Sequence, residues 1–200
     1  MKRLSEVKID DAKYYETVWT EEALGSHWHY DAVRQRALAR HVRPGHKVID
    51  IGAGVWGTCQ YIATELKIPN VSLVAYDQSY TARDAVMKMA PSLIYVIGGL
   101  PVIPMFYSGE FDVVIAGEII EHMVEPDILA YELCRICKTD GWVCLSTVDT
   151  HCANAIKHGP YPEHVWEFEP MDLVNLFKDY GYTTHEYVGD YHMVFCQVKR

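Results

Sequence analysis

Short apolar runs alternate with amphipathic stretches through the middle of this chain. After most runs, apolar residues recur every three or four positions, which is the spacing of one face of a helix. Continuous apolar runs are typical of parallel strands that are buried on both faces. The runs that we expect to form strands are 48–51, 72–76, 93–97, 111–116 and 142–147, and the expected helices are 58–66, 81–90 and 127–138.

The two ends of the chain follow other patterns. Residues 1–45 are rich in aromatic residues and are expected to form one or two helices, with the clearest pattern at 31–42. This segment could act as a cap or lid through Tyr14, Tyr15, Trp19, Trp28 and Tyr30. Near the other end, a helix from Pro170 precedes two strands, 183–188 and 191–199. Gly189-Asp190 between them favours a tight hairpin turn.

Alternating strands and helices predict an α/β fold with a Rossmann-like, doubly wound sheet. We expect seven strands, mostly parallel, with the C-terminal hairpin adding an antiparallel strand. A chain of 200 residues suits one domain, so residues 1–200 are assigned to a single domain, with the cap at 1–45 and the core at 46–200.

Charge and hydropathy exclude several classes of partner. A net charge of −9 without a cluster of lysines or arginines argues against a nucleic-acid surface. Residues 1–10 contain no apolar leader, and no run approaches the ~18 apolar residues of a membrane span. We therefore expect a cytoplasmic protein with no nucleic-acid or membrane partner, and its six cysteines are expected to be free thiols.

Chemistry-bearing residues follow the first two of these strands. The first strand leads through Asp50 into a turn with the pattern Gly52-x-Gly54-x-x-Gly57, and a helix follows. Strand, glycine turn and helix form the ligand crevice of a doubly wound sheet. Asp77 ends the next strand. An acid at this position and this glycine spacing are also typical of NAD-binding domains, so an NAD-dependent oxidoreductase is one alternative.

Four blocks of the chain resemble the class I S-adenosylmethionine (SAM)-dependent methyltransferases. The resemblance is to the small-molecule and saccharide type related to the ubiquinone-pathway methyltransferases. The blocks stand in the order found in that family: Val48–Gly57, Leu73–Asp77, Phe111–His122 and Leu133–Ser146.

The resemblance implies SAM as the cofactor and S-adenosylhomocysteine as its product. It implies that Asp77 accepts hydrogen bonds from the ribose hydroxyls, that Asp50 lies beneath the glycine turn, and that Glu118 lies where the methionyl end and the acceptor meet. The residues expected at the cofactor are Asp50, Gly52, Ala53, Gly54, Asp77, Gln78, Gly99, Leu100 and Glu118. Many relatives carry an acid for adenine near 97–100; this chain has none there, so backbone groups or Leu100 are expected to take that role.

The resemblance also implies that the segments after the fourth and fifth strands line the acceptor site. A hydroxyl acceptor is helped by a general base, and the candidates are Glu118, His122 and His164. The chain lacks the Asn/Asp-Pro-Pro-aromatic and Pro-Cys sequences of enzymes that methylate DNA bases. This leaves a small molecule, a saccharide or a protein that tolerates an acidic partner, and the resemblance favours a small molecule or saccharide. A SAM-binding subunit without catalysis is the second alternative, and a homodimer is left open.

No metal site is expected from the sequence. Asp149, His151 and His164 offer ligand atoms, but their spacing matches no recognisable ligand pattern.

Overall fold

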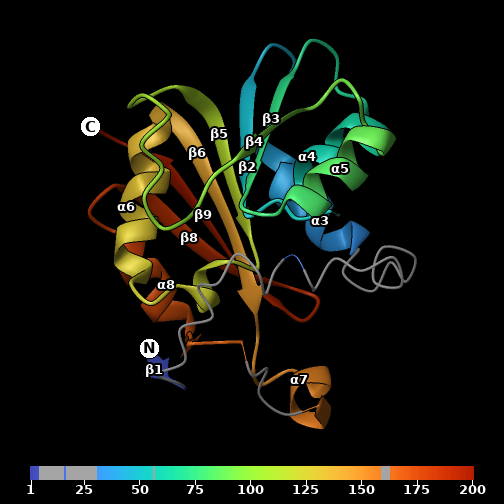
Figure 1. Ribbon diagram of the computed structural model, residues 1–200. Helices are drawn as coiled ribbons and strands as arrows, with labels where there is room; N and C mark the ends of the chain where they lie inside the picture. The colour runs from blue at the N-terminus through green and yellow to red at the C-terminus, as the bar shows by residue number, and fades with distance from the viewer. Residues whose placement is uncertain (5–15, 17–30, 56, 159–162) are drawn as a thin grey trace.

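A seven-stranded sheet with helices on both faces dominates the molecule (Figure 1). The computed structural model describes residues 1–4, 16, 31–55, 57–158 and 163–200. The strand order is β4-β3-β2-β5-β6-β9-β8. These strands are β2 (Lys47–Ile51), β3 (Ser72–Asp77), β4 (Ile94–Ile97), β5 (Phe111–Gly117), β6 (Cys137–Val148), β8 (Gly181–Val188) and β9 (Tyr191–Val198).

The strand directions confirm the predicted fold class. β4, β3, β2, β5 and β6 pair in parallel, and β9 runs antiparallel to both β6 and β8. The hairpin turn falls at the expected pair, where Val188 lies opposite Tyr191 and Gly189 has a φ of +59°. The sheet is thus a Rossmann-like, doubly wound sheet, and the antiparallel hairpin of β8 and β9 forms its last two strands on the side of β6.

Two helical layers cover the sheet. α3 (Ala32–Leu38), α4 (Thr58–Tyr61) and α5 (Tyr80–Met89) pack on one face, while α6 (Pro126–Ile136) and α8 (Pro170–Phe177) pack on the other (Figure 1). Successive residues of β5 point to opposite faces of the sheet. Val113 and Ile115 pack on the side of α3, α4 and α5, whereas Val114 and Ala116 pack on the side of α6 and α8. This double burial explains why the central strands are continuous apolar runs. The six cysteines are unpaired, and five of them are buried, as expected.

Two predicted helices end differently from the expectation. The helix expected over 58–66 is α-helical only to Tyr61 and continues as a π-helical turn, in which the Lys67 N–H donates to the Ile62 carbonyl. The helix expected to reach residue 138 ends at Ile136 instead. The reason is that β6 begins early, because Cys137 pairs with Phe111.

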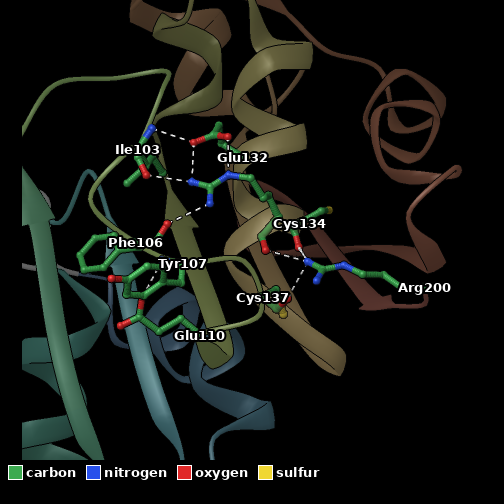
Figure 2. A network of polar contacts seen from close by, with 9 residues as sticks. Ile103, Phe106, Tyr107, Glu110, Glu132, Cys134, Cys137 and Arg200 are labelled. Atoms are coloured by element: carbon green, nitrogen blue, oxygen red, sulfur yellow. Dashed lines mark hydrogen bonds and ion pairs between the residues drawn. The ribbon is translucent and has the colours of Figure 1, made fainter.

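Charged side chains fasten the end of α6 to its surroundings (Figure 2). The Arg200 guanidinium donates to the carbonyls of Cys134, Arg135 and Cys137. Arg135 pairs with Glu132 and donates to the carbonyls of residues 103 and 106. Glu132 also accepts the N–H of residue 103 at 2.8 Å. These contacts hold the long connection between β4 and β5 against the helix.

The segment after β6 contains elements that the sequence did not indicate. No helix or strand was predicted between the fifth strand and Pro170, but this segment includes α7 (Ala153–His158) and β7 (Trp166–Glu167). β7 pairs with β1 (Lys2–Arg3), so the first residues of the chain lie beside this connection. A two-residue strand carries almost no pattern of its own and depends on its partner for hydrogen bonds, which explains why neither strand was predicted.

Most of the expected N-terminal cap lies outside the described residues, including all five of its aromatic residues named above. Its described helical part is α3 and a 3₁₀ turn at Ala39–His41. Glu16 is also described, and its carboxylate accepts the N–H groups of Tyr80 and Thr81 at the start of α5. Within the described residues, no helix has the length and apolar character needed to cross a membrane.

Candidate active site

Asp50 lies beneath the glycine turn, as predicted. Its side chain is 2% exposed, and Oδ2 accepts the N–H of Cys59 at 3.0 Å, which ties the start of α4 to the end of β2. Burial raises the pKa of this carboxyl to about 6, against the lowering effect of the hydrogen bonds from α4. A Cβ on Gly57 would lie 2.6 Å from Oδ2, so the third glycine is needed for this close packing.

The turn itself needs glycine conformations. Gly52 has a φ of +70° and Gly54 a φ of +52°, a region that other residues adopt at a cost. Gly52 and Ala53 both donate their N–H groups to the Tyr76 carbonyl, which fixes the turn against the neighbouring strand.

Asp77 ends β3 and faces this turn. Oδ2 accepts the Gly54 N–H at 2.9 Å, and Oδ1 accepts the Ser79 N–H at 2.9 Å. Burial raises the pKa of the Asp77 carboxyl. A carboxylate offers about four lone-pair positions, so each oxygen keeps capacity for one more donor. Two adjacent hydroxyls, such as those of a ribose, match that remaining capacity.

Two tyrosines hold the loops that follow β2 and β4. The Tyr95 hydroxyl donates to the Gly54 carbonyl at 3.1 Å, and the Tyr76 hydroxyl donates to the Gly99 carbonyl at 2.7 Å. A Cβ on Gly99 would meet nothing within 4 Å, so this position faces open space. The loop that contains Gly99 follows the end of β4, beside Asp77. In this loop Leu100 is partly buried and packs against the core, and Gln78, which follows Asp77, is also partly buried. The predicted residues therefore converge at one edge of the sheet.

Glu118 follows β5 in a conformation that its side chain resists, with a φ of +54°. Its Oε1 lies 3.6 Å from Nη1 of Arg34 and accepts the Ser146 hydroxyl at 3.4 Å. Burial, with the Glu121 carboxylate as the second cause, raises the pKa of Glu118 to about 8. The carboxyl is therefore mostly protonated at neutral pH and half protonated near pH 8.

Arg34 is a site residue that the sequence analysis missed. It projects from α3, is 7% exposed, and its guanidinium lies 4.9 Å from the Tyr191 ring centroid. Its neighbour Gln35 is also buried and accepts a hydrogen bond from the Thr58 hydroxyl. Arg34, Gln35 and Leu38 share the buried face of α3. The available signal was a pair of polar residues, Arg34 and Gln35, on the face that also carries Leu38, because a buried charge needs a partner.

Two of the predicted bases meet after β5. The rings of His122 and His164 are 4.9 Å apart and nearly perpendicular, although the residues are far apart in the sequence. The contact forms because the Val165 N–H donates to the Glu121 carbonyl at 2.8 Å. Burial lowers the pKa of both histidines, and that of His164 falls to about 3. Both imidazoles are therefore neutral at physiological pH.

His122 has a defined hydrogen-bond partner. Its Nδ1 lies 3.1 Å from the Glu163 carbonyl oxygen. A carbonyl oxygen can only accept, so Nδ1 carries the proton and Nε2 carries the lone pair. This arrangement lets His122 accept a proton or bind a cation through Nε2.

Glu121, which the sequence analysis did not consider, joins this pair. Glu121, His122 and His164 each place one possible ligand atom within 4.8 Å of the others, in the only such group of three among the described residues. Asp149 and His151 do not belong to it. Instead, the Asp149 carboxylate accepts the His151 N–H and lies 3.5 Å from Nε2 of His192.

Comparisons with known proteins agree with this geometry. A family model described as a methyltransferase domain matches residues 22–187. A search of curated proteins gave no match. The match decides against the nicotinamide-dependent alternative.

Three solved structures illustrate the likeness in fold. One is a complex between the Haloferax volcanii Trm112 methyltransferase activator and a methyltransferase (TM-score 0.77, 14% identity, covering 93% of this chain and 98% of that chain). Another is a SAM-dependent methyltransferase from Aquifex aeolicus (TM-score 0.69, 15% identity, 94% and 98%). The third is Haemonchus contortus phosphoethanolamine N-methyltransferase 2 with S-adenosyl-L-methionine (TM-score 0.73, 12% identity, 96% and 61%).

The family match spans most of the chain, and the neighbours include a complex with S-adenosyl-L-methionine. The chain therefore belongs to the methyltransferase domain family, and it shares its fold with a SAM-dependent methyltransferase.

Proposed function

We propose that this enzyme methylates a hydroxyl oxygen of a small molecule or saccharide, in the manner of the small-molecule methyltransferases. The observation that carries the proposal is the neutral His122 imidazole, with its lone pair on Nε2, beside Glu118 at the end of β5. A neutral base next to a carboxyl group suits removal of a proton from a weakly acidic hydroxyl. The net charge of −9 supports a small acceptor over a nucleic acid.

Each expected cofactor residue has a defined role in this proposal. Asp77 binds the two ribose hydroxyls, and Gly52, Ala53 and Gly54 let the turn approach the bound molecule. Asp50 acts from beneath by fixing the turn and the start of α4. Gln78, Gly99 and Leu100 border the adenine. SAM supplies the methyl group on an activated sulfonium.

Arg34 adds a charge that this cofactor needs. The methionyl end of SAM carries a carboxylate, and the Arg34 guanidinium at the Glu118 end of the site is a suitable partner for it. Glu118 in turn faces the methionyl amino group and the acceptor.

Alignment and proton removal are the main tasks of the remaining residues. The acceptor oxygen must lie in line with the methyl carbon and the sulfur, because the new C–O bond forms as the C–S bond breaks. The hydroxyl proton passes to the group of Glu118, His122 and His164. Within this group His164 is buried, which limits the access of competing water from its side.

Arg34→Met is expected to weaken the binding of S-adenosylhomocysteine without weakening that of methylthioadenosine. Methylthioadenosine retains adenine and ribose but lacks the amino-acid part, so Arg34 has nothing to bind in it. The expected loss is about 1.5–3 kcal/mol, the value of a hydrogen bond to a charged group. Isothermal calorimetry with both ligands measures it, and an equal loss for both would contradict this role of Arg34.

The acceptor class is tested by transfer of labelled methyl groups from SAM to a panel of phenols, sugars, amines and thiols. Label in a methyl ether, identified by mass spectrometry, is the expected product. Label only in amines would overturn the oxygen assignment while leaving the methyltransferase assignment intact. Tight S-adenosylhomocysteine binding without transfer to any acceptor would instead favour the non-catalytic SAM-binding subunit.

A further inference from the structure

The group formed by Glu121, His122 and His164 has the composition of a metal site. It combines one carboxylate and two imidazoles, with one ligand atom of each within 4.8 Å of the other two. Tetrahedral zinc has bonds of about 2.0–2.1 Å to nitrogen and oxygen, so its ligand atoms lie roughly 3.4 Å apart. Binding of an ion would therefore require the three donors to move closer together.

The Glu121 carboxylate gives an independent reason to expect a cation. The residue is 1% exposed, and neither buried carboxylate oxygen makes a hydrogen bond of normal geometry to a described residue. The neighbouring Thr147 side chain is close enough to lower the pKa of the carboxyl, against the larger effect of burial. Glu118 and Glu163 add further negative charge nearby, and Arg34 is the positive side chain that acts on Glu121. A buried carboxylate with so little compensation is costly, and a bound cation would reduce that cost.

The hydrogen bond of His122 favours the same assignment. A histidine that binds a metal usually donates its other ring N–H to a carbonyl or carboxylate, which orients the ring. Nδ1 of His122 donates to the Glu163 carbonyl at 3.1 Å, so Nε2 is the ring nitrogen that carries the lone pair a metal ligand needs. His122 is also partly exposed, so an ion can enter from that side of the group.

We propose that Glu121, His122 and His164 bind one divalent transition-metal ion, of which zinc is the best fit, at the acceptor end of the site. Two nitrogen donors and one oxygen donor favour zinc over magnesium, which prefers oxygen ligands. This differs from the sequence-based expectation of no metal, because that expectation rested on Asp149 and His151 and did not include Glu121.

The role of the metal ion rests on the proposed transfer to oxygen, and it adds a way to make the acceptor hydroxyl more acidic. Three protein ligands leave an open position, where an acceptor hydroxyl can bind and become more acidic. Nε2 of His122 then serves as a ligand, and the hydroxyl proton passes to Glu118 in its ionised form. The oxygen's electron pair forms the new bond to the methyl carbon as the C–S bond breaks.

Zinc titration of the chelator-treated protein tests the site without any acceptor. Calorimetry should show one zinc ion per chain and no comparable binding of magnesium. Cobalt, used as a spectroscopic probe, should give the visible absorption of a nitrogen- and oxygen-ligated ion. Glu121→Gln and His164→Asn should each weaken zinc binding by at least ~100-fold. Replacing a residue that only hydrogen-bonds to a metal ligand already costs up to ~100-fold, and replacing a ligand itself should cost at least as much.

His151→Asn is the matched control, because this exposed histidine lies outside the group; its zinc affinity should equal that of the wild-type chain. Unchanged S-adenosylhomocysteine binding in all variants shows that they are folded. Equal zinc affinity in wild type and Glu121→Gln, or no stoichiometric zinc binding, would overturn the metal site. Methyl-ether formation by a zinc-free enzyme would overturn the metal's part in transfer yet retain the proposed function.

Discussion

Replacing His122 by asparagine is expected to lower the turnover number by about 10²–10⁴-fold, the usual effect of losing a general base. The loss is expected whether Nε2 takes the proton itself or binds the ion that activates the hydroxyl. Asparagine can still donate a hydrogen bond to the Glu163 carbonyl, so the local structure should persist. Single-turnover transfer of labelled methyl groups measures the effect.

Binding of S-adenosylhomocysteine provides the control for this variant. Its affinity should stay at the wild-type value, because His122 lies on the acceptor side. His164→Asn should show a loss of similar direction, since its ring packs against His122. If both variants keep full turnover, the acceptor proton is handled by Glu118 alone or needs no base, and the role of the histidines is refuted.

The positions of the glycine turn and of the acid that faces it could be predicted from the sequence because they lie at strand ends. Asp50, Gly54 and Asp77 follow buried apolar runs, and parallel strands place their carboxyl ends at one edge of the sheet. The spacing alone does not say how they meet. Only the structure shows that Asp77 accepts the Gly54 N–H or that Tyr95 holds the Gly54 carbonyl.

The acceptor side was less predictable because its contacts are long-range. Glu121 lies within a recognised block, but its burial depends on the 3₁₀ turn at Ile120–His122. His164 reaches His122 through a backbone hydrogen bond between Val165 and Glu121. Arg34 belongs to a correctly predicted helix, yet its direction toward Glu118 follows from how α3 packs on the sheet.

Replacing Asp77 by alanine is expected to weaken S-adenosylhomocysteine binding by about 1.5–3 kcal/mol, because each carboxylate oxygen loses a ribose hydroxyl. At about 1.4 kcal/mol per factor of ten, the dissociation constant rises roughly 10- to 150-fold. Methylthioadenosine should lose affinity to the same extent, since it retains the ribose. This separates Asp77 from Arg34, whose replacement should affect only the ligand that carries a carboxylate.

Calorimetry on the wild-type chain and Asp77→Ala tests the central claim most directly, with S-adenosylhomocysteine and NAD as the two ligands. The account predicts one S-adenosylhomocysteine site per wild-type chain, the stated loss in Asp77→Ala, and no NAD binding in either protein. NAD binding that depends on Asp77, or S-adenosylhomocysteine binding that is unchanged in Asp77→Ala, would contradict the assignment of the cofactor site.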